Sequence, residues 1–379
     1  MQLSTFSFQA GSGWSLPSFP SLDSPQTLVM VFAAPEYIDN PAPLAELHAA
    51  YPKSHLIGCS TAGEIAGPLV GDRSLSVAVL RFEHSHIASV HADIKQSSES
   101  LNAAEKLVRQ LDPAGLRAVF ILCDGLNVNG SELVKGLNGA LPPEVVVTGG
   151  LAADGDRFKR TWVIRNGRPQ SGIITAVGLY GDRLRVTHGS RGGWDSFGPE
   201  RRITRSNSNI LYELDGKPAL ELYKEYLGER ASGLPATGLL FPLSIRKDAN
   251  DSRQVVRTIL GVDEANQALI FAGDLPKGYL AQLMRANFDR LVNGASLAAD
   301  QARGDAKATG PVLAAAISCV GRRLVLGERI EEETESTLEN LPPGTQQIGF
   351  YSYGEISPYT SGSCDLHNQT MTLTTFAET

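Results

Sequence analysis

Short apolar runs alternate with helix-compatible stretches along the chain. Two runs, LVMVFAA from Leu28 and VLAAAIS from Val312, have the length and composition of buried strands. A helix-compatible stretch follows each of them, PLAELHAAYP from Pro43 and EEETESTLENLPP from Glu331. Segments that alternate apolar and polar residues, such as LSVAVLRF from Leu75, predict half-buried strands. The pattern therefore predicts a layered α/β fold.

One short motif occurs twice at equivalent places in this pattern. Residues 57–65 read IGCSTAGEI and residues 348–356 read IGFYSYGEI, so both fit I-G-x-x-x-x-G-E-I. Each copy follows an apolar run and a helix-compatible stretch, and each precedes an alternating segment. We therefore predict internally duplicated strand-helix-strand units.

A weaker third copy is predicted between these two. AVFILCDG from Ala118 has the pattern of a strand, SELVKGLNGALP from Ser131 that of a helix, and VVVTGGLAADG from Val145 that of a strand entering a glycine turn. Further along, PALELYKEYL from Pro218 predicts a helix with Gly228 as its C-terminal cap. The small, polar stretch 298–310 predicts a surface connection or a frayed helix end.

Composition and charge narrow the class of protein. Hydrophobic residues make up 42% and charged residues 20%, which is typical of a globular chain. Lys and Arg number 34 against 41 Asp and Glu, a net charge of −7 with no basic block, so we expect no nucleic-acid partner. The amino terminus lacks a signal-peptide pattern, and no apolar run approaches the ~18 residues of a membrane span. We therefore expect a soluble, cytoplasmic protein with no membrane partner.

The four cysteines are spread through the chain without a C-x-x-C pair, which excludes a disulfide framework and a zinc site built from cysteine pairs. We expect buried, reduced thiols. They are Cys59, Cys123, Cys319 and Cys364.

Several segments together resemble the FIST family of bacterial sensory proteins. They are GCSTAGEI from Gly58, DGLNVNGSELVKGL from Asp124, TGGLAADG from Thr148, LYELDGKPALELYKEYLG from Leu211, SCVGRR from Ser318, YSYGEISP from Tyr351 and CDLHNQTMTLTTF from Cys364. The resemblance runs over nearly the whole chain. It implies a FIST N-type region at 1–214 and a FIST C-type region at 215–379, in a fold that senses a ligand in signal transduction.

The resemblance also carries expectations about ligand and partner. Members of this family occur alone or fused to kinases, cyclases and chemoreceptors, and the two regions use up the length of this chain. We therefore expect a stand-alone sensor that signals to a separate histidine kinase or another signalling protein, with homo-oligomerisation left open. Some stand-alone members, the NosP type, bind haem and sense nitric oxide, whereas small amino-acid-like ligands are the general expectation for the family.

The repeated motif supplies the first candidate ligand residues. Glu64 and Glu355 occupy equivalent positions, where a carboxylate either accepts a ligand ammonium group or caps the amides of a turn in a duplicated core. Cys59, Ser60 and Thr61 stand inside the first copy and would add thiol or hydroxyl contacts.

Consecutive glycines and a strand-end aspartate form a second group of candidates. The amides of Gly149 and Gly150 would form an anion-binding nest or simply a tight turn. Asp124 ends a predicted strand before a helix whose cap is Asn129 or Ser131, so local capping explains it as well as ligand binding does.

Haem requires an axial ligand in an apolar pocket, and histidine is the usual one. The preferred candidate is His188, in VTHGSRGGWDSFGP, where Trp194 would shape a flat slot and Arg191 would face a carboxylate. The second candidate is His367 in CDLHNQTMTL, and its neighbour Asn368 is a candidate ligand-binding residue. For both histidines a structural role is the alternative.

Motifs of catalysis are absent from the sequence. There is no G-x-S-x-G elbow, no H-E-x-x-H helix and no kinase signature, so we expect no enzyme activity. The leading hypothesis is a haem-based nitric oxide sensor. The alternatives are a sensor of an amino-acid-like metabolite, with its carboxylate at Gly149 and Gly150 and its ammonium at Glu64 or Glu355, and a scaffold that signals without a ligand.

Overall fold

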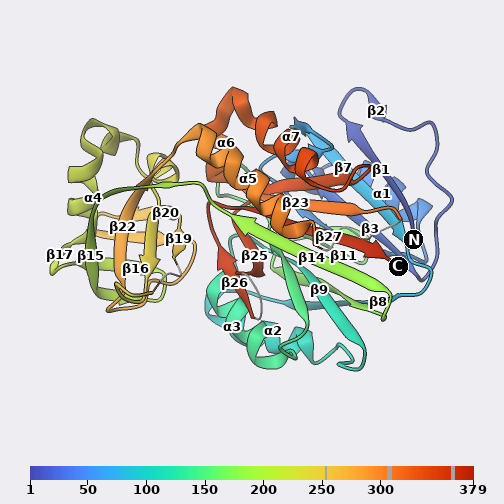
Figure 1. Ribbon diagram of the computed structural model, residues 1–379, viewed down its shortest axis with the longest axis horizontal. Coiled ribbons are helices and arrows are strands. Elements are labelled where there is room, and N and C mark those ends of the chain that lie inside the picture. The colour runs from blue at the N-terminus through green and yellow to red at the C-terminus, as the bar shows by residue number, and fades with distance from the viewer. Residues whose placement is uncertain (252–253, 305–309, 360–362) are drawn as a thin grey trace.

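The chain folds into a large α/β body and a smaller second lobe, as Figure 1 shows for the computed structural model. The structure describes residues 1–251, 254–304, 310–359 and 363–379. The body comprises residues 1–194 and 286–379, and the second lobe comprises residues 195–285. The predicted layered α/β fold is confirmed, because helices cover the outer faces of the sheets in the body.

The body repeats one strand arrangement three times in the described residues. In each unit, helical structure joins two parallel strands, and a later strand returns antiparallel beside the first of them. A fourth strand, which comes first in the chain order of the unit, pairs with the returning strand. The first unit consists of β1 (Gln2–Gln9), β3 (Thr27–Ala33), α1 (Ala42–Ala50), β4 (His55–Ser60) and β7 (Ser74–Arg81), with β2 (Gly13–Trp14) at the sheet edge.

The other two units follow the same order. The second contains β8 (His86–Asp93), α2 (Ser100–Val108), β9 (Leu116–Cys123), α3 (Gly130–Ala140), β10 (Val146–Leu151) and β13 (Ile173–Tyr180). The third contains β14 (Leu184–Arg191), α5 (Phe288–Ala302), β23 (Leu313–Cys319), α6 (Val320–Leu326), α7 (Ile330–Asn340), β24 (Gln346–Ser352) and β27 (Met371–Glu378). The weaker third copy expected from the sequence is thus the second of three structural units.

Each unit also donates a hairpin to the sheet of another unit. The hairpin of β5 (Glu64–Ala66) and β6 (Leu69–Gly71) pairs with β24, that of β11 (Val163–Arg165) and β12 (Arg168–Gln170) pairs with β4, and that of β25 (Gly354–Pro358) and β26 (Cys364–His367) pairs with β10. This cyclic exchange joins the three sheets through backbone hydrogen bonds, so the units form one domain.

The three sheets enclose a common apolar core. Phe32 and Phe350 meet with ring centroids 4.6 Å apart, and Phe120 meets Phe376 at 5.8 Å, so all three units contribute aromatic rings. Gly149 permits close packing of neighbouring strands, since a Cβ built there would lie 1.8 Å from the carbonyl oxygen of Ile121.

Helix ends follow the sequence signals in most places. Asn129, one of the two predicted caps, caps α3 by accepting from the amides of Ser131 and Glu132 at 3.0 and 3.2 Å. The predicted helix at Pro218 is α4 (Ala219–Leu227), which ends at Gly228 with φ 58°. The prediction for 298–310 was partly wrong, because α5 continues through Ala302; residues 305–309 lie outside the described residues.

The second lobe is one curved sheet with α4 against it and an apolar core of its own. Its strands, in spatial order, are β19 (Val255–Arg257), β18 (Leu243–Arg246), β22 (Leu280–Arg285), β15 (Asp195–Asn207), β16 (Ile210–Leu214), β21 (Ala268–Phe271) and β20 (Ile259–Asp263), with β17 (Lys217–Pro218) beside β16. Short 3-10 helices are η1 (Pro35–Ile38), η2 (Ser97–Glu99), η3 (Gly228–Gly233), η4 (Ala236–Leu240) and η5 (Gly327–Arg329). Among the described residues, no helix is long and apolar enough to span a membrane.

Candidate functional site

The two motif glutamates hold the start of the returning strands. Glu64 accepts from the amide and hydroxyl of Ser74 at 3.1 and 2.6 Å and from the hydroxyl of Thr61. Glu355 accepts from the amide and hydroxyl of Thr370 at 3.2 and 2.9 Å and from the hydroxyl of Ser352 at 2.7 Å. Their buried oxygens are therefore engaged within the protein. This geometry favours the capping role over reception of a ligand ammonium group.

In the middle unit, a carboxylate at a different sequence position holds the residue before the returning strand. Gly155 stands where the other two units have a glutamate, and Asp124 at the end of β9 accepts instead from the amide of Gly172 at 2.6 Å. Its other oxygen accepts from the hydroxyl of Thr161 at 2.7 Å. Each of the three units thus has a carboxylate that fixes the residue at or before its returning strand.

Burial changes the acidity of the motif carboxyls. Desolvation raises the pKa of Glu64 to about 7 and that of Glu355 to about 8, against the lowering effect of the hydroxyl and amide donors around them. Burial also raises the pKa of the Cys59 thiol. Ser60 is buried as well, and its hydroxyl accepts from the amide of Trp162 at 3.1 Å. Cys59, Ser60 and Thr61 consequently belong to the packed interior.

Gly149 and Gly150 lie inside strand β10. Both glycines pair with β9 on one side and with β25 on the other, and Gly150 lies opposite Glu355 of β25. The expected tight turn or anion nest at these two residues is thus corrected to a strand interior. Glycine is required because the neighbouring strands approach closely, as the Gly149 contact with Ile121 shows.

The two histidine candidates meet around one residue, Ser357 of β25. His188 Nδ1 lies 3.5 Å from the Ser357 hydroxyl, and His367 Nε2 lies 2.9 Å from the Ser357 carbonyl oxygen, to which it donates. Burial lowers the pKa of His188, so its imidazole is neutral near pH 7. Thr374 pairs with His188 across the strands, and its buried hydroxyl has no partner in the part of the chain that is described.

The other candidate ligand residues, Trp194, Arg191 and Asn368, do not form one slot. Trp194 packs in an apolar cluster with Met284 and Leu291, at the junction of the two lobes, and donates to the Gln369 carbonyl oxygen at 2.9 Å. Asn368 is buried and its amide donates to the Tyr353 carbonyl oxygen at 3.4 Å. Arg191 ends β14 opposite Met371 and is half-buried.

A spacious cleft lined mainly by polar side chains lies between the two lobes. It encloses about 340 Å³, a volume in the range of small-molecule sites. We call it the interlobe cleft; its lining consists of Ser131 and Asp365 from the body and Ile245, Arg246, Lys247, Asp251, Val255, Arg257, Asp274, Pro276 and Tyr279 from the second lobe.

Hydrogen bonds across the floor of the cleft join the lobes. Arg257, which is 6% exposed, donates to the carbonyl oxygens of Asp274 and Leu366 at 3.1 and 3.0 Å. The Asp274 amide donates to the Ser131 hydroxyl at 3.1 Å, and Asn129 donates to the Asp274 carboxylate at 3.1 Å. The cleft is thus bounded by fixed polar groups of both signs.

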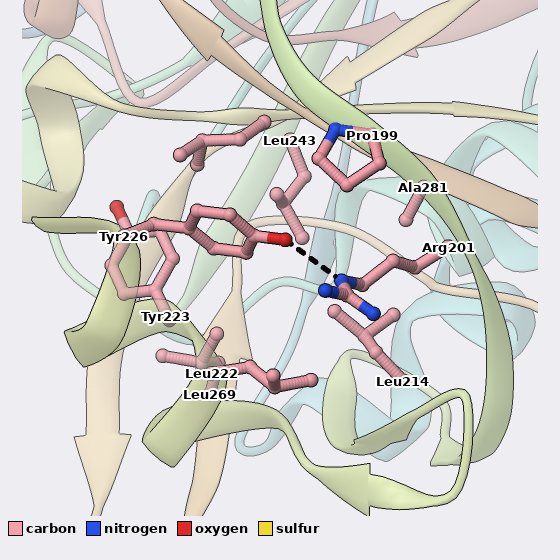
Figure 2. A pocket seen from close by; sticks show the side chains of 10 residues that line it. Pro199, Arg201, Leu214, Leu222, Tyr223, Tyr226, Leu243, Leu269 and Ala281 are labelled. Carbon is pink, nitrogen blue, oxygen red and sulfur yellow. Dashed lines mark hydrogen bonds between the residues drawn. The ribbon is translucent and has the colours of Figure 1, made fainter.

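Sequence reasoning missed this cleft. Its lining comes from several separate segments, and most of its residues lie outside the motifs that carry the family resemblance. The second lobe has a hollow of its own beneath α4, which Figure 2 shows with Arg201 and Tyr226 hydrogen-bonded at 2.9 Å. Its apolar interior holds only about 20 Å³, room for roughly one water molecule. In the described residues, no group of three or more His, Cys, Asp or Glu side chains is arranged to hold a metal ion.

The chain belongs to the FIST family. The FIST N domain matches residues 27–217 and the FIST C domain matches residues 219–358. FIST domains are generally sensory domains of signal transduction. The division of the chain into a FIST N-type region at 1–214 and a FIST C-type region at 215–379 stays a prediction. The body and the second lobe divide the chain at other residues.

The chain is similar to proteins that are themselves described as uncharacterised. An uncharacterised protein of Mycobacterium tuberculosis, Rv0628c, is 25% identical over 346 residues, covering 88% of this chain and 87% of that protein. Another, MJ1623 of Methanocaldococcus jannaschii, is 27% identical over 187 residues, covering 47% of this chain and 36% of that protein.

Two solved structures share a distant likeness. A cyanuric acid hydrolase from A. caulinodans has a TM-score of 0.33 and 9% identity, covering 93% of this chain and 89% of its own. A second cyanuric acid hydrolase has a TM-score of 0.29 and 9% identity, covering 100% and 99%. Because both neighbours are enzymes, they contradict the prediction that the chain is not an enzyme, which is therefore withdrawn. A likeness this low transfers no hydrolase activity to this chain.

Proposed function

We propose that this protein is a sensor that binds a small polar molecule in the interlobe cleft and signals its occupancy to a separate partner, such as a histidine kinase. The observation that carries the proposal is the cleft of about 340 Å³ with walls from both lobes. Interfaces between lobes are preferred places for small-molecule sites, because a ligand there contacts two bodies at once.

The lining suggests the chemistry of the ligand. Lys247 and the buried Arg257 supply positive charge, whereas Asp274 and Asp365 supply negative charge. A molecule that carries both an anionic and a cationic group would complement this arrangement. An amino-acid-like metabolite has that character. The cleft is a better site for it than Glu64, Gly149 and Glu355, because internal hydrogen bonds and strand pairing already engage those residues.

Binding can be tested although the ligand is unidentified. Saturation-transfer NMR on the full chain would be run with each of the common amino acids and with related zwitterions. We expect signal transfer to at least one compound, weakened by Lys247→Gln in the cleft and retained by Lys217→Gln, which changes an exposed lysine elsewhere in the second lobe. Absence of transfer to every compound at millimolar concentration would contradict the proposal.

Haem-based sensing of nitric oxide is the second candidate, and one specific observation favours it. His188 is half-buried and neutral, and its Nε2 has no hydrogen-bond partner among the described residues, which suits an axial ligand. His367 suits that role less well, because its Nε2 already donates to Ser357. Bound haem would supply the iron to which nitric oxide coordinates. His188 would hold that group, and Ser357 would orient the imidazole.

An absorbance spectrum tests the haem candidate directly. Protein reconstituted with haemin should show a stoichiometric Soret band that is lost or shifted in His188→Ala. The band should be unchanged in His91→Ala, which alters a strand histidine of β8. A colourless reconstituted protein, or a His188→Ala band identical to that of the wild type, would remove this candidate.

A further inference from the structure

Two connecting segments carry the chain between the body and the second lobe, and both are visible in Figure 1. Residues 192–194 lead from β14 into β15, and residues 286–287 lead from β22 into α5. The width of the interlobe cleft depends on how these segments are held, because the lobes are otherwise joined through side-chain contacts.

A single buried arginine contacts the chain beside both connections. Arg322 on α6 donates to the Gly192 carbonyl oxygen at 2.7 Å and to the Leu291 carbonyl oxygen at 2.8 Å. Its charge is balanced by Glu333 on α7, whose carboxylate lies 2.8 Å from the guanidinium; both side chains are 0% exposed. An arginine with its donors fixed in this way holds two carbonyl groups at a defined separation.

The turn between β26 and β27 contacts the second lobe directly. Gln369 lies in this turn with φ 63°, and its side-chain amide donates to the Leu239 carbonyl oxygen of η4 at 3.0 Å. Its own carbonyl oxygen accepts from Trp194 in the first connection, and the next residue, Thr370, is fixed by Glu355. Gln369 therefore links the interior of the body with both the connection and the second lobe.

Gly321, the residue before Arg322 on α6, leaves space for the Gln369 side chain. A Cβ built on Gly321 would lie 2.4 Å from the Gln369 amide nitrogen and 2.5 Å from its amide oxygen. Any side chain at position 321 would displace the end of Gln369 from Leu239. Two neighbouring residues of α6 thus affect the lobe junction. Arg322 donates hydrogen bonds beside both connections, and Gly321 leaves the space that the Gln369 side chain occupies.

We propose that Gln369, Gly321 and Arg322 are positioning residues that fix the second lobe over the body and thereby set the width of the interlobe cleft. This inference rests on the proposed function of the cleft. It gives a ligand in the cleft a route to the body, since a change of cleft width moves the Leu239 contact with Gln369. Through Thr370, that movement reaches the returning strand β27.

The test measures the lobe separation without any ligand, so that its outcome is independent of the binding experiment. The four native cysteines are buried, which allows selective spin labelling of cysteines introduced by Ser98→Cys in the body and Ser232→Cys in the second lobe. Distance distributions would be measured by double electron-electron resonance on the full chain. The variants are Gln369→Met, which removes the donor and keeps the volume, and Gly321→Ala; the control is Gly139→Ala in α3, where a Cβ meets nothing within 4 Å.

We expect Gln369→Met and Gly321→Ala each to broaden or shift the distance distribution, and Gly139→Ala to leave it unchanged. Amide exchange in residues 236–240 should become roughly fivefold faster in both variants, the factor that corresponds to losing one typical buried hydrogen bond. A folded Gln369→Met protein with wild-type distances and wild-type exchange would overturn the proposal. If Gly321→Ala fails to fold, Gln369→Met decides alone.

Discussion

Glu355 holds Thr370 through the same pair of hydrogen bonds by which Glu64 holds Ser74, one to the backbone amide and one to the side-chain hydroxyl. The two pairs lie in different units of the body and are related by its internal repeat. The repeated G-E-I sequence therefore marks a structural connection between the exchanged hairpin of a unit, which begins with this glutamate region, and the returning strand of the same unit.

Because the carboxyls of Glu64 and Glu355 have raised pKa values, we expect the stability of the protein to fall as the pH rises. Their folded pKa values of about 7 and about 8 lie above the ordinary value of 4.5, so the folded state binds more protons than the unfolded state between those limits. The contribution to stability is fully present below about pH 4.5 and is lost as pH rises through 7 and 8. Each carboxyl contributes at most about 1.4 kcal/mol per pH unit.

Urea unfolding at pH 5, 7 and 9 measures this effect. We expect Glu355→Gln to flatten the fall in the free energy of unfolding between pH 5 and pH 9, because glutamine does not titrate. Glu335→Gln, at an exposed position of α7, should leave the slope as in the wild type. A wild-type slope in Glu355→Gln would show that burial of this carboxyl does not govern the pH dependence.

Substitution of Gly149 tests the close strand approach. Gly149→Ala should destabilise the protein by about 3 kcal/mol or more, because the new methyl group overlaps the Ile121 carbonyl oxygen and φ is 145°. Gly139→Ala, in a helix with open space around it, should instead stabilise it by roughly 0.5 to 1 kcal/mol. Equal effects of the two substitutions in chemical denaturation would refute the close contact at Gly149.

The buried Arg322 and Glu333 pair should show strong non-additivity. Arg322→Met alone should cost about 3 to 5 kcal/mol, since it leaves a buried carboxylate without its counter-charge. Arg322→Met combined with Glu333→Leu should cost much less than the sum of the single substitutions. A double-mutant cycle from denaturant unfolding gives the coupling, and additive effects would mean that the pair is not coupled.

Asn129 both caps α3 and donates a hydrogen bond to Asp274 in the cleft, and two substitutions separate these roles. Asn129→Ser keeps an oxygen that caps α3 but loses the hydrogen bond to Asp274 in the cleft, whereas Asn129→Ala loses both. We expect the alanine variant to lose about 1 kcal/mol more than the serine variant in the free energy of unfolding. Both variants should show faster amide exchange around Asp274. Unchanged exchange there in Asn129→Ser would contradict the assigned contact.

The repeat could be predicted from sequence because its fold-determining residues stayed similar in two copies. The middle copy was harder to find, since Asp124 replaces the motif glutamate from another strand and Gly155 occupies the motif position. The hairpin exchange could not be predicted, because the patterns of β5, β11 and β25 specify strands and not which sheet they join.

The candidate site was predictable only in part. His188 and His367 were selected from sequence, but their meeting at Ser357 depends on strand pairing between distant segments. The interlobe cleft escaped prediction because Ser131, Arg257 and Asp365 are polar residues of ordinary local pattern. Only the insertion of the second lobe between β14 and α5 brings them together.

Thermal unfolding with added ligand tests the central claim most directly. The full chain would be heated with each zwitterionic metabolite, in parallel with the Lys247→Gln and Lys217→Gln variants. A ligand at about 100 times its Kd stabilises the folded state by about 2.7 kcal/mol, which raises Tm by several degrees. We predict such a rise for at least one compound in the wild type and in Lys217→Gln, and a much smaller rise in Lys247→Gln. A Tm that no compound raises, or a rise that Lys247→Gln leaves intact, would contradict a ligand site in the interlobe cleft.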